Sequence, residues 1–214
     1  GGHEAPPAIM SVFSGSTLSK VFESIIKTKS LPKAKATKES IKIASTVPDI
    51  FPDNTDRNRT SPFAFTGNRF EFRAVGSSMN VAGATYVINS IVAASLREFR
   101  AEVDKLEAKG EKRDDAVMDV IRKFITVSQD IMFDGNGYSK EWQEEAAKRG
   151  IKAVTNVPDA FDVYKEKGTI DLFNKLGVLT PAELESRYEV YNETYVKKLQ
   201  IEARVIGDIC LNHV

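Results

Sequence analysis

Beyond residue 80, apolar side chains recur at intervals of three and four residues, and this periodicity constrains the fold more than any other feature. The clearest stripe, between residues 114 and 133, consists of Val117, Val120, Ile121, Phe124, Val127 and Ile131. Side chains at these intervals share one face of an α-helix, so the stripe predicts an amphipathic helix. Comparable patterns predict helices over 81–108 and 139–149, two more within 161–176, and a long one from Thr180. The C-terminal two-thirds should therefore be a helical assembly.

Two helix starts carry local signals. Thr180, Pro181 and Glu183 combine an N-cap, a proline in the first turn and a capping-box glutamate. Residues 134–138 resemble the start of a calcium loop, but the position that requires glycine is Ser139. We interpret this stretch as an ordinary turn in which Ser139 caps the next helix. Trp142 has apolar neighbours and is interpreted as a packing residue.

A short hairpin with an unusual charge pattern is predicted before the helices. Strands at 63–65 and 69–73 flank a turn at 66–68, with Pro62 confined to the edge. Alternate side chains of a strand share a face, so Arg69, Glu71 and Arg73 should point one way. Phe70 and Phe72 should point the other way as anchors. A carboxylate among guanidinium groups suits phosphoryl transfer or carboxylate activation, whereas a plain ion-pair cluster on a solvated strand is the alternative.

The N-terminal part is less regular. Residues 8–13 suit a short buried strand or a helix start, and apolar spacing predicts a helix from about Ser16 to Lys27. Residues 27–56 are polar and contain three prolines, so we expect a loop with at most one strand. The lysines in this stretch carry no interleaved aromatic residue, which favours a solvated insertion over a nucleic-acid surface.

Composition excludes several classes of protein. Thirty basic residues balance thirty acidic ones, so net charge gives no reason to expect nucleic acid or an anionic membrane as a partner. The single cysteine, Cys210, excludes an internal disulfide, and the two histidines lie at opposite ends of the chain. No signal peptide or membrane-length apolar run occurs, which favours the cytoplasm. The chain lacks an initial Met and its last helix lacks a stop signal, so we expect a fragment of a longer polypeptide.

Four segments together resemble the glutamine synthetase signature. Asn58-Arg59-Thr60 resembles the family's Asn-Arg-Ser segment, and Arg69-Phe-Glu-Phe-Arg73 resembles its Arg-Ile-Glu-x-Arg strand. Ser77-Ser-Met-Asn80 stands where the family has a loop before a helix. At the N-terminus, Gly2-His-Glu-Ala-Pro-Pro7 is similar to the family's flap motif.

Further details resemble type III glutamine synthetases. These are the Glu-Ala-Pro-Pro-Ala-Ile form of the flap, the long stretch before Asn58, and Thr60-Ser-Pro-Phe-Ala-Phe65. The similarity continues through Phe133–Ser139 and Gly207–His213, so it covers most of the chain. It implies an α+β, helix-dominated fold. Residues 1–80 would be the C-terminal part of the catalytic domain, including the flap, the insertion and the hairpin, and 81–214 a helical C-terminal region.

The resemblance also implies an activity, ATP-dependent ligation of ammonia to L-glutamate through a γ-glutamyl phosphate. Mg²⁺ or Mn²⁺ would be the cofactor, ATP a substrate, and the parent a ring-shaped homo-oligomer. Carried over by motif, Glu71 would be the carboxylate of the nucleotide-side metal, and Arg73 would bind the glutamate side chain and its acyl phosphate. Arg59 would act on the transferred phosphoryl group, and Glu4 would close the flap and take a proton from ammonium.

The chain also departs from the family pattern. The family has a second arginine where this chain has Ala64, and Arg57 or Arg69 could take its place. Most other metal ligands and nucleotide contacts are absent from the sequence, so the chain would carry one wall of an active site and be inactive alone. The alternatives are a related γ-glutamyl-amine ligase and a non-catalytic helical module that drives oligomer assembly.

Overall fold

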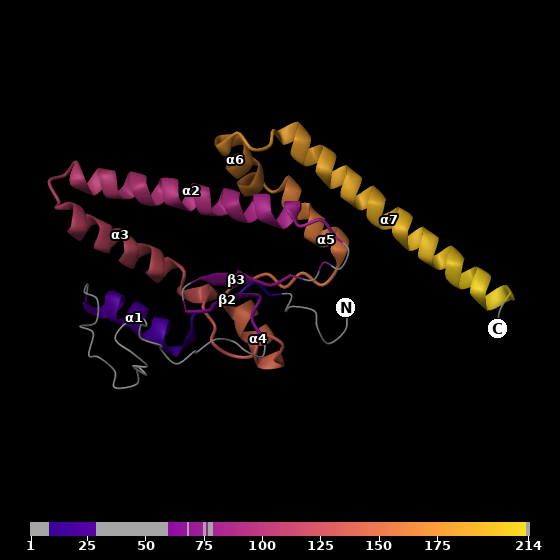
Figure 1. Ribbon diagram of the computed structural model, residues 1–214, viewed down its shortest axis with the longest axis horizontal. Helices are drawn as coiled ribbons and strands as arrows, with labels where there is room; N and C mark the ends of the chain where they lie inside the picture. The colour runs from indigo at the N-terminus through magenta and orange to yellow at the C-terminus, as the bar shows by residue number, and fades with distance from the viewer. Residues whose placement is uncertain (1–8, 29–59, 68, 75, 77–78, 213–214) are drawn as a thin grey trace, which may run out of the picture. The chain divides into compact units, whose positions relative to one another are not determined.

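A computed structural model describes residues 9–28, 60–67, 69–74, 76 and 79–212 (Figure 1). The chain divides into two compact units, which we describe separately. The first comprises residues 1–80 and 98–153, and the second comprises 81–97 and 154–214. The long helix α2 (Ala82–Glu107) contributes its N-terminal part to the second unit and its C-terminal part to the first. The domain boundary expected at residue 80 stays a prediction.

A three-stranded sheet lies in the first unit, with the order β1 (Val12–Phe13), β2 (Phe63–Phe65) and β3 (Phe70–Phe72). Strand β1 runs parallel to β2, and β2 runs antiparallel to β3 with Ala64 opposite Glu71. The predicted hairpin is thus confirmed, and so is the helix after β1, which is α1 (Gly15–Thr28).

Three more helices lie among the described residues of the first unit: α3 (Arg113–Val127), the 3-10 helix η1 (Gln129–Ile131) and α4 (Lys140–Lys148). Val103 of α2 is buried with Ala116 and Val120 of α3, and Val117 and Phe124 pack against them, so the first part of the predicted apolar stripe does form a core. The last two residues of the stripe do not, since Val127 is 74% exposed and Ile131 is 41% exposed. A second cluster joins Ile9, which precedes β1, to Trp142 of α4.

The helix predicted over 114–133 ends earlier than expected, at Val127. The backbone N–H of Phe133 donates to the carbonyl of Val12 at 3.0 Å, and Met132 forms a parallel bridge with the same residue. Pairing with Val12 requires extended backbone at these positions, so the α-helix cannot continue through them.

The second unit is helical and contains α5 (Val157–Phe161), the 3-10 helix η2 (Asp162–Lys165), α6 (Lys167–Leu176) and α7 (Pro181–Asn212). Its core consists of Phe173, Leu179 and Leu184, with Tyr86 of α2 and Tyr164 packed against it. Burial, with Tyr86 and Tyr191 nearby, raises the pKa of the Tyr164 hydroxyl above its usual range. The helix-dominated α+β class expected from the sequence is confirmed.

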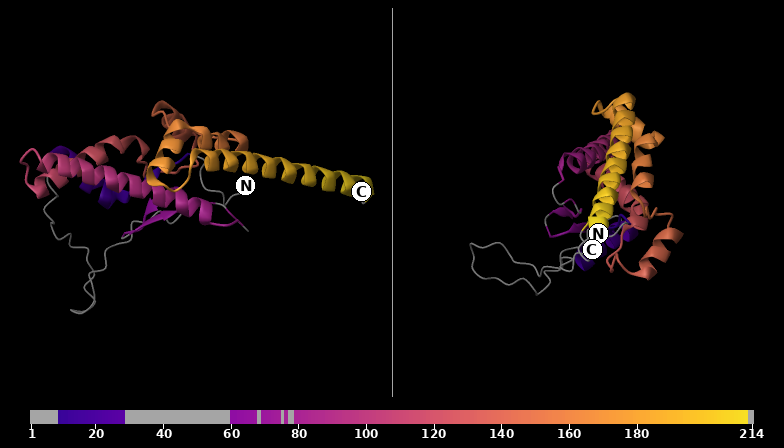
Figure 2. Two further views of the ribbon diagram at one scale, coloured as in Figure 1. Left: turned by 90° about the horizontal axis from the view of Figure 1, so that it is seen from above. Right: turned by 90° about the vertical axis from the view of Figure 1, so that its right-hand side faces the viewer.

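The capping box predicted for α7 is present. The backbone N–H of Thr180 donates to Glu183 Oε2 at 2.8 Å, and the N–H of Glu183 donates to Thr180 Oγ1 at 3.3 Å. The hydrogen bond from the Thr180 backbone, followed by that from its hydroxyl, lowers the pKa of the Glu183 carboxyl. Figure 2 shows the C-terminal half of α7 extending past α5 and α6 of the same unit.

Candidate active-site hairpin

The turn of the β2–β3 hairpin is closed by backbone and side-chain bonds. The N–H of Thr66 donates to the carbonyl of Arg69 at 2.8 Å, and the Thr66 hydroxyl contacts the same oxygen. Gly67 has φ +95°, a left-handed value at which other side chains are strained. Local sequence therefore fixes the register that places Glu71 on the same face as Ala64.

The charged side chains in β3 and directly beside it meet on one face, as the alternation predicts. Arg69 Nη2 lies 3.4 Å from Glu71 Oε1, and Arg73 Nη2 lies 3.4 Å from Glu71 Oε2. The Arg69 side chain is 71% exposed, that of Glu71 39%, and that of Arg73 only 16%. The cluster thus runs from an open end at Arg69 to a covered end at Arg73.

Arg73 is held by backbone as well as by charge. Its N–H donates to the carbonyl of Pro62 at 2.8 Å, and its Nη1 donates to the carbonyl of Ser61 at 3.2 Å. Ser61 itself is buried. The orientation of this guanidinium therefore depends on where the backbone of residues 61–62 lies.

The aromatic face differs from the expectation. Phe70 and Phe72 are 43% and 39% exposed, so they do not anchor the strand in a core. Their rings pack on the aromatic residues of β2, with centroids 5.3 Å apart for Phe63–Phe70 and 5.2 Å for Phe65–Phe70. The covered face of β2 is the opposite one, where Ala64 is fully buried.

Two of the four predicted site residues, Glu4 and Arg59, lie outside the described residues, as does Arg57. The structure brings Glu71 and Arg73 together. Within the described ranges, no group of three or more acidic, histidine or cysteine side chains could hold a metal ion. Mg²⁺ takes six ligands and Ca²⁺ six to eight, so Glu71 could supply one ligand but could not form a site alone.

The loop at residues 134–138, which was expected to be an ordinary turn, contacts the junction between β1 and α1. The carboxylate of Asp134 accepts the backbone N–H groups of Ser14 at 2.7 Å and Gly15 at 3.0 Å, and the Ser19 hydroxyl at 2.6 Å. It thereby caps α1 from 120 residues away in the sequence. The turn itself forms as expected, since Ser139 Oγ accepts the N–H of Trp142.

Trp142 has the packing role that was predicted. Its side chain is buried and stacks on Phe133 with 3.9 Å between ring centroids. The Arg149 guanidinium lies over the indole at 5.2 Å. This stack fixes the start of the 133–139 segment against α4.

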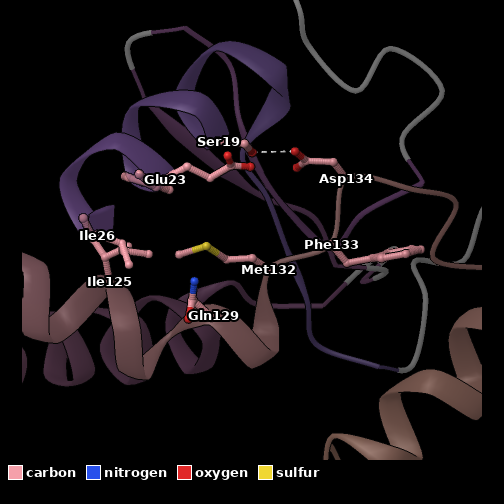
Figure 3. Close-up of a pocket in the computed structure, with 9 residues that line it drawn as sticks. Ser19, Glu23, Ile26, Ile125, Gln129, Met132, Phe133 and Asp134 are labelled. Atoms are coloured by element: carbon pink, nitrogen blue, oxygen red, sulfur yellow. Dashed lines mark hydrogen bonds between the residues drawn. The ribbon is translucent and has the colours of Figure 1, made fainter. Parts of the chain in front are cut away.

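A hollow of about 210 Å³ lies beside Asp134 (Figure 3). Its lining comes from α1, α3, η1 and residues 132–134, and the Ser19–Asp134 hydrogen bond lies at its margin. Neither Glu71 nor Arg73 lines it. The hollow is therefore separate from the charged face of the hairpin.

Sequence comparisons with known proteins all point to one family. Residues 116–214 match the family model described as the glutamine synthetase C-terminal domain. A glutamine synthetase of Bacteroides fragilis is 45% identical over 100% of this chain, and the type-3 glutamine synthetase of Dictyostelium discoideum is 40% identical over 98%. A glutamine synthetase of Butyrivibrio fibrisolvens is 38% identical over 98%. The chain is thus related along its length to glutamine synthetases, and the resemblance drawn from its motifs is confirmed.

The chain spans only 30%, 28% and 29% of the lengths of these relatives. Within the part of the chain that the structure describes, every helix is too short or too polar to cross a membrane.

Proposed function

We propose that this chain is part of a glutamine synthetase, an ATP-dependent ligase that joins ammonia to L-glutamate through a γ-glutamyl phosphate. The observation that carries the proposal is the similarity to glutamine synthetases over nearly the whole chain, at 38–45% identity. The Arg-Glu-Arg face of β3 supports it, because the reaction handles two anionic groups, a carboxylate and a phosphoryl group.

Each site residue has a role that its chemistry suits. Arg73 binds the side-chain carboxylate of glutamate and then the acyl phosphate formed from it, since a guanidinium fork matches both oxyanions. Arg59 stabilises the phosphoryl group during transfer, and Glu4 accepts a proton from ammonium, which leaves ammonia free to attack the acyl carbon. Arg69 or Arg57 replaces the arginine that the family has at the position of Ala64.

Glu71 supplies one ligand to a divalent cation, Mg²⁺ or Mn²⁺, on the nucleotide side of the site. Such a cation neutralises charge on the phosphate oxygens of ATP. The arginines on both sides of Glu71 hold the carboxylate in place through contacts of 3.4 Å. A related γ-glutamyl-amine ligase would use the same side chains and differ in the amine that it accepts.

The proposal is tested by comparing this chain with the longer protein to which it would belong. The longer protein should form glutamine from glutamate, ammonia and ATP, whereas the isolated chain should form none, because it lacks most ligands and cannot position the reactants. The measurement is glutamine or hydroxamate formation above a blank without enzyme. If the isolated chain formed product, the proposal that it carries only part of the active site would be wrong. If the longer protein formed none, the proposed function would be wrong.

A role in assembly is the second candidate, and α7 favours it. Beyond Tyr195 this helix carries a run of exposed apolar side chains: Val196, Leu199, Ile201, Val205, Ile206, Ile209 and Leu211. Apolar surface of this extent is typical of an interaction site. In the parent it would serve the ring-shaped homo-oligomer. Neither nucleic acid nor a membrane is proposed as a partner, and a cytoplasmic location stays a prediction.

We therefore expect the isolated chain to self-associate. Ile206→Lys should shift the chain toward monomer because it places a charge in the apolar surface, whereas Lys197→Gln, which changes an exposed lysine paired with Glu193, should not. Sedimentation at tens of micromolar would measure the distribution of species. A stable monomer for the unmodified chain would contradict this expectation and remove the support for the assembly role.

A further inference from the structure

We propose that the segment 132–137, through Asp134, is a positioning element for Arg73. This inference rests on the proposed function, because it assigns the segment a role in the same site. The segment lies in the first unit with the hairpin and attaches at two places to the chain around it.

The first attachment is to the end of β1 and the start of α1. The N–H of Phe133 donates to the carbonyl of Val12 at 3.0 Å, and Asp134 Oδ1 accepts the N–H groups of Ser14 and Gly15. A carboxylate at a helix N-terminus satisfies donors that have no partner within the helix and also interacts favourably with the helix dipole. Strand β1 is in turn paired with β2, Val12 opposite Phe63.

The second attachment is to the segment that leads into β2. The N–H of Gly137 donates to the carbonyl of Thr60 at 2.9 Å. The next residue, Ser61, is buried, and its hydroxyl contacts the carbonyl of Ser11 at 3.4 Å. The carbonyl of the same Ser61 accepts the Arg73 guanidinium at 3.2 Å.

The two attachments connect the Asp134 carboxylate to the Arg73 guanidinium through the backbone of the loop and of residues 60–61. Asp134 holds the β1–α1 junction to the loop, the loop holds Thr60, and residue 61 orients Arg73. Asp134 is the charged residue of segment 132–137. Its carboxylate accepts hydrogen bonds of 2.6–3.0 Å from three donors, the N–H groups of Ser14 and Gly15 and the hydroxyl of Ser19. Its loss should let the entry to β2 shift relative to β1 and thereby displace the Arg73 guanidinium. A small misplacement of a binding group is costly to catalysis.

The test uses the longer protein, after its wild-type form has been shown to make glutamine. Asp134→Ala removes all three acceptor contacts, and we expect kcat/KM for glutamate to fall about 2- to 30-fold, a range that treats the stability contribution of a helix cap as the positioning free energy lost at Arg73. The KM for glutamate should rise while the KM for ATP stays within about twofold, because Arg73 touches glutamate and not the nucleotide. Asp134→Asn keeps the Oδ1 acceptor and should recover most of the loss.

The matched control is Asp130→Ala, which removes a nearby exposed carboxylate that makes no hydrogen bond among the described residues; it should leave both KM values unchanged. In the Arg73→Lys background, Asp134→Ala should lower kcat/KM for glutamate little further, because the guanidinium that Asp134 positions is already absent. If Asp134→Ala does not fold, the same measurements are made on Asp134→Glu, which displaces the carboxylate by one methylene.

Three results would overturn the inference while leaving the function intact. The first is that Asp134→Ala lowers only the amount of active enzyme and leaves both KM values normal. The second is that the effects of Asp134→Ala and Arg73→Lys on kcat/KM are fully additive. The third is that the Asp134 and Asp130 variants have the same kinetics. Absence of activity in the wild-type protein would instead refute the proposed function itself.

Discussion

Arg73→Lys in the longer protein should lower kcat/KM for glutamate by about 10- to 150-fold, which corresponds to roughly 1.5–3 kcal/mol. Lysine keeps the positive charge but presents a single ammonium in place of a planar fork. It therefore cannot hold two oxygens of a carboxylate or acyl phosphate in one plane. Arg73 is also the most covered charge of its strand, so water compensates poorly for a lost contact.

The measurement is steady-state kinetics with glutamate varied at several fixed Mg²⁺ concentrations. Added metal should not restore the activity of Arg73→Lys, since the lost contact is to the substrate. Arg100→Lys makes the same substitution at a strongly exposed arginine of α2 that pairs with Asp104, and it should behave as wild type. Wild-type rates for Arg73→Lys would show that Arg73 has only a structural role, hydrogen bonding to the backbone of residues 61–62.

Sequence patterns predicted the elements of this chain well where local signals decide the structure. The capping box at Thr180, the glycine turn at Gly67 and the apolar stripe of α3 each determine a conformation within a few residues. Alternation along β3 likewise placed Glu71 between its arginines. In these cases the interacting groups are close in the sequence, so the pattern contains the information.

Features that depend on distant partners were missed or misjudged. The α3 stripe runs on to Ile131, but the pairing of Met132 and Phe133 with Val12 ends the helix sooner. Asp134 caps a helix 120 residues away, and no spacing rule connects those positions. A weak signal was present, since α1 has no acidic residue in its first turn and a carboxylate from another segment could therefore interact favourably with its N-terminus.

The face of the hairpin that is covered was also misjudged. Alternation separates Phe70 and Phe72 from the charges, but it does not say which face the remaining structure covers. Here the buried face is that of Ala64, and the aromatic face is partly open.

Glu71→Gln should reduce activity in a way that metal concentration partly reverses, and this separates it from Arg73→Lys. Glutamine has the shape of glutamate but lacks the anionic oxygens that hard divalent cations prefer, so affinity for the cation should fall while the arrangement of β3 is kept. Raising Mg²⁺ or Mn²⁺ refills the weakened site by mass action and should recover part of the rate.

Glu107→Gln is a suitable control, because its carboxylate also pairs with an arginine at 3.4 Å but lies on α2, away from the hairpin. The metal dependence of initial rates is the measurement, with isothermal binding of Mn²⁺ as an independent readout. If the Glu71 and Arg73 variants gave the same metal titration curves, the cluster would be a structural ion pair on β3, and the separate roles assigned to its two charges would be wrong.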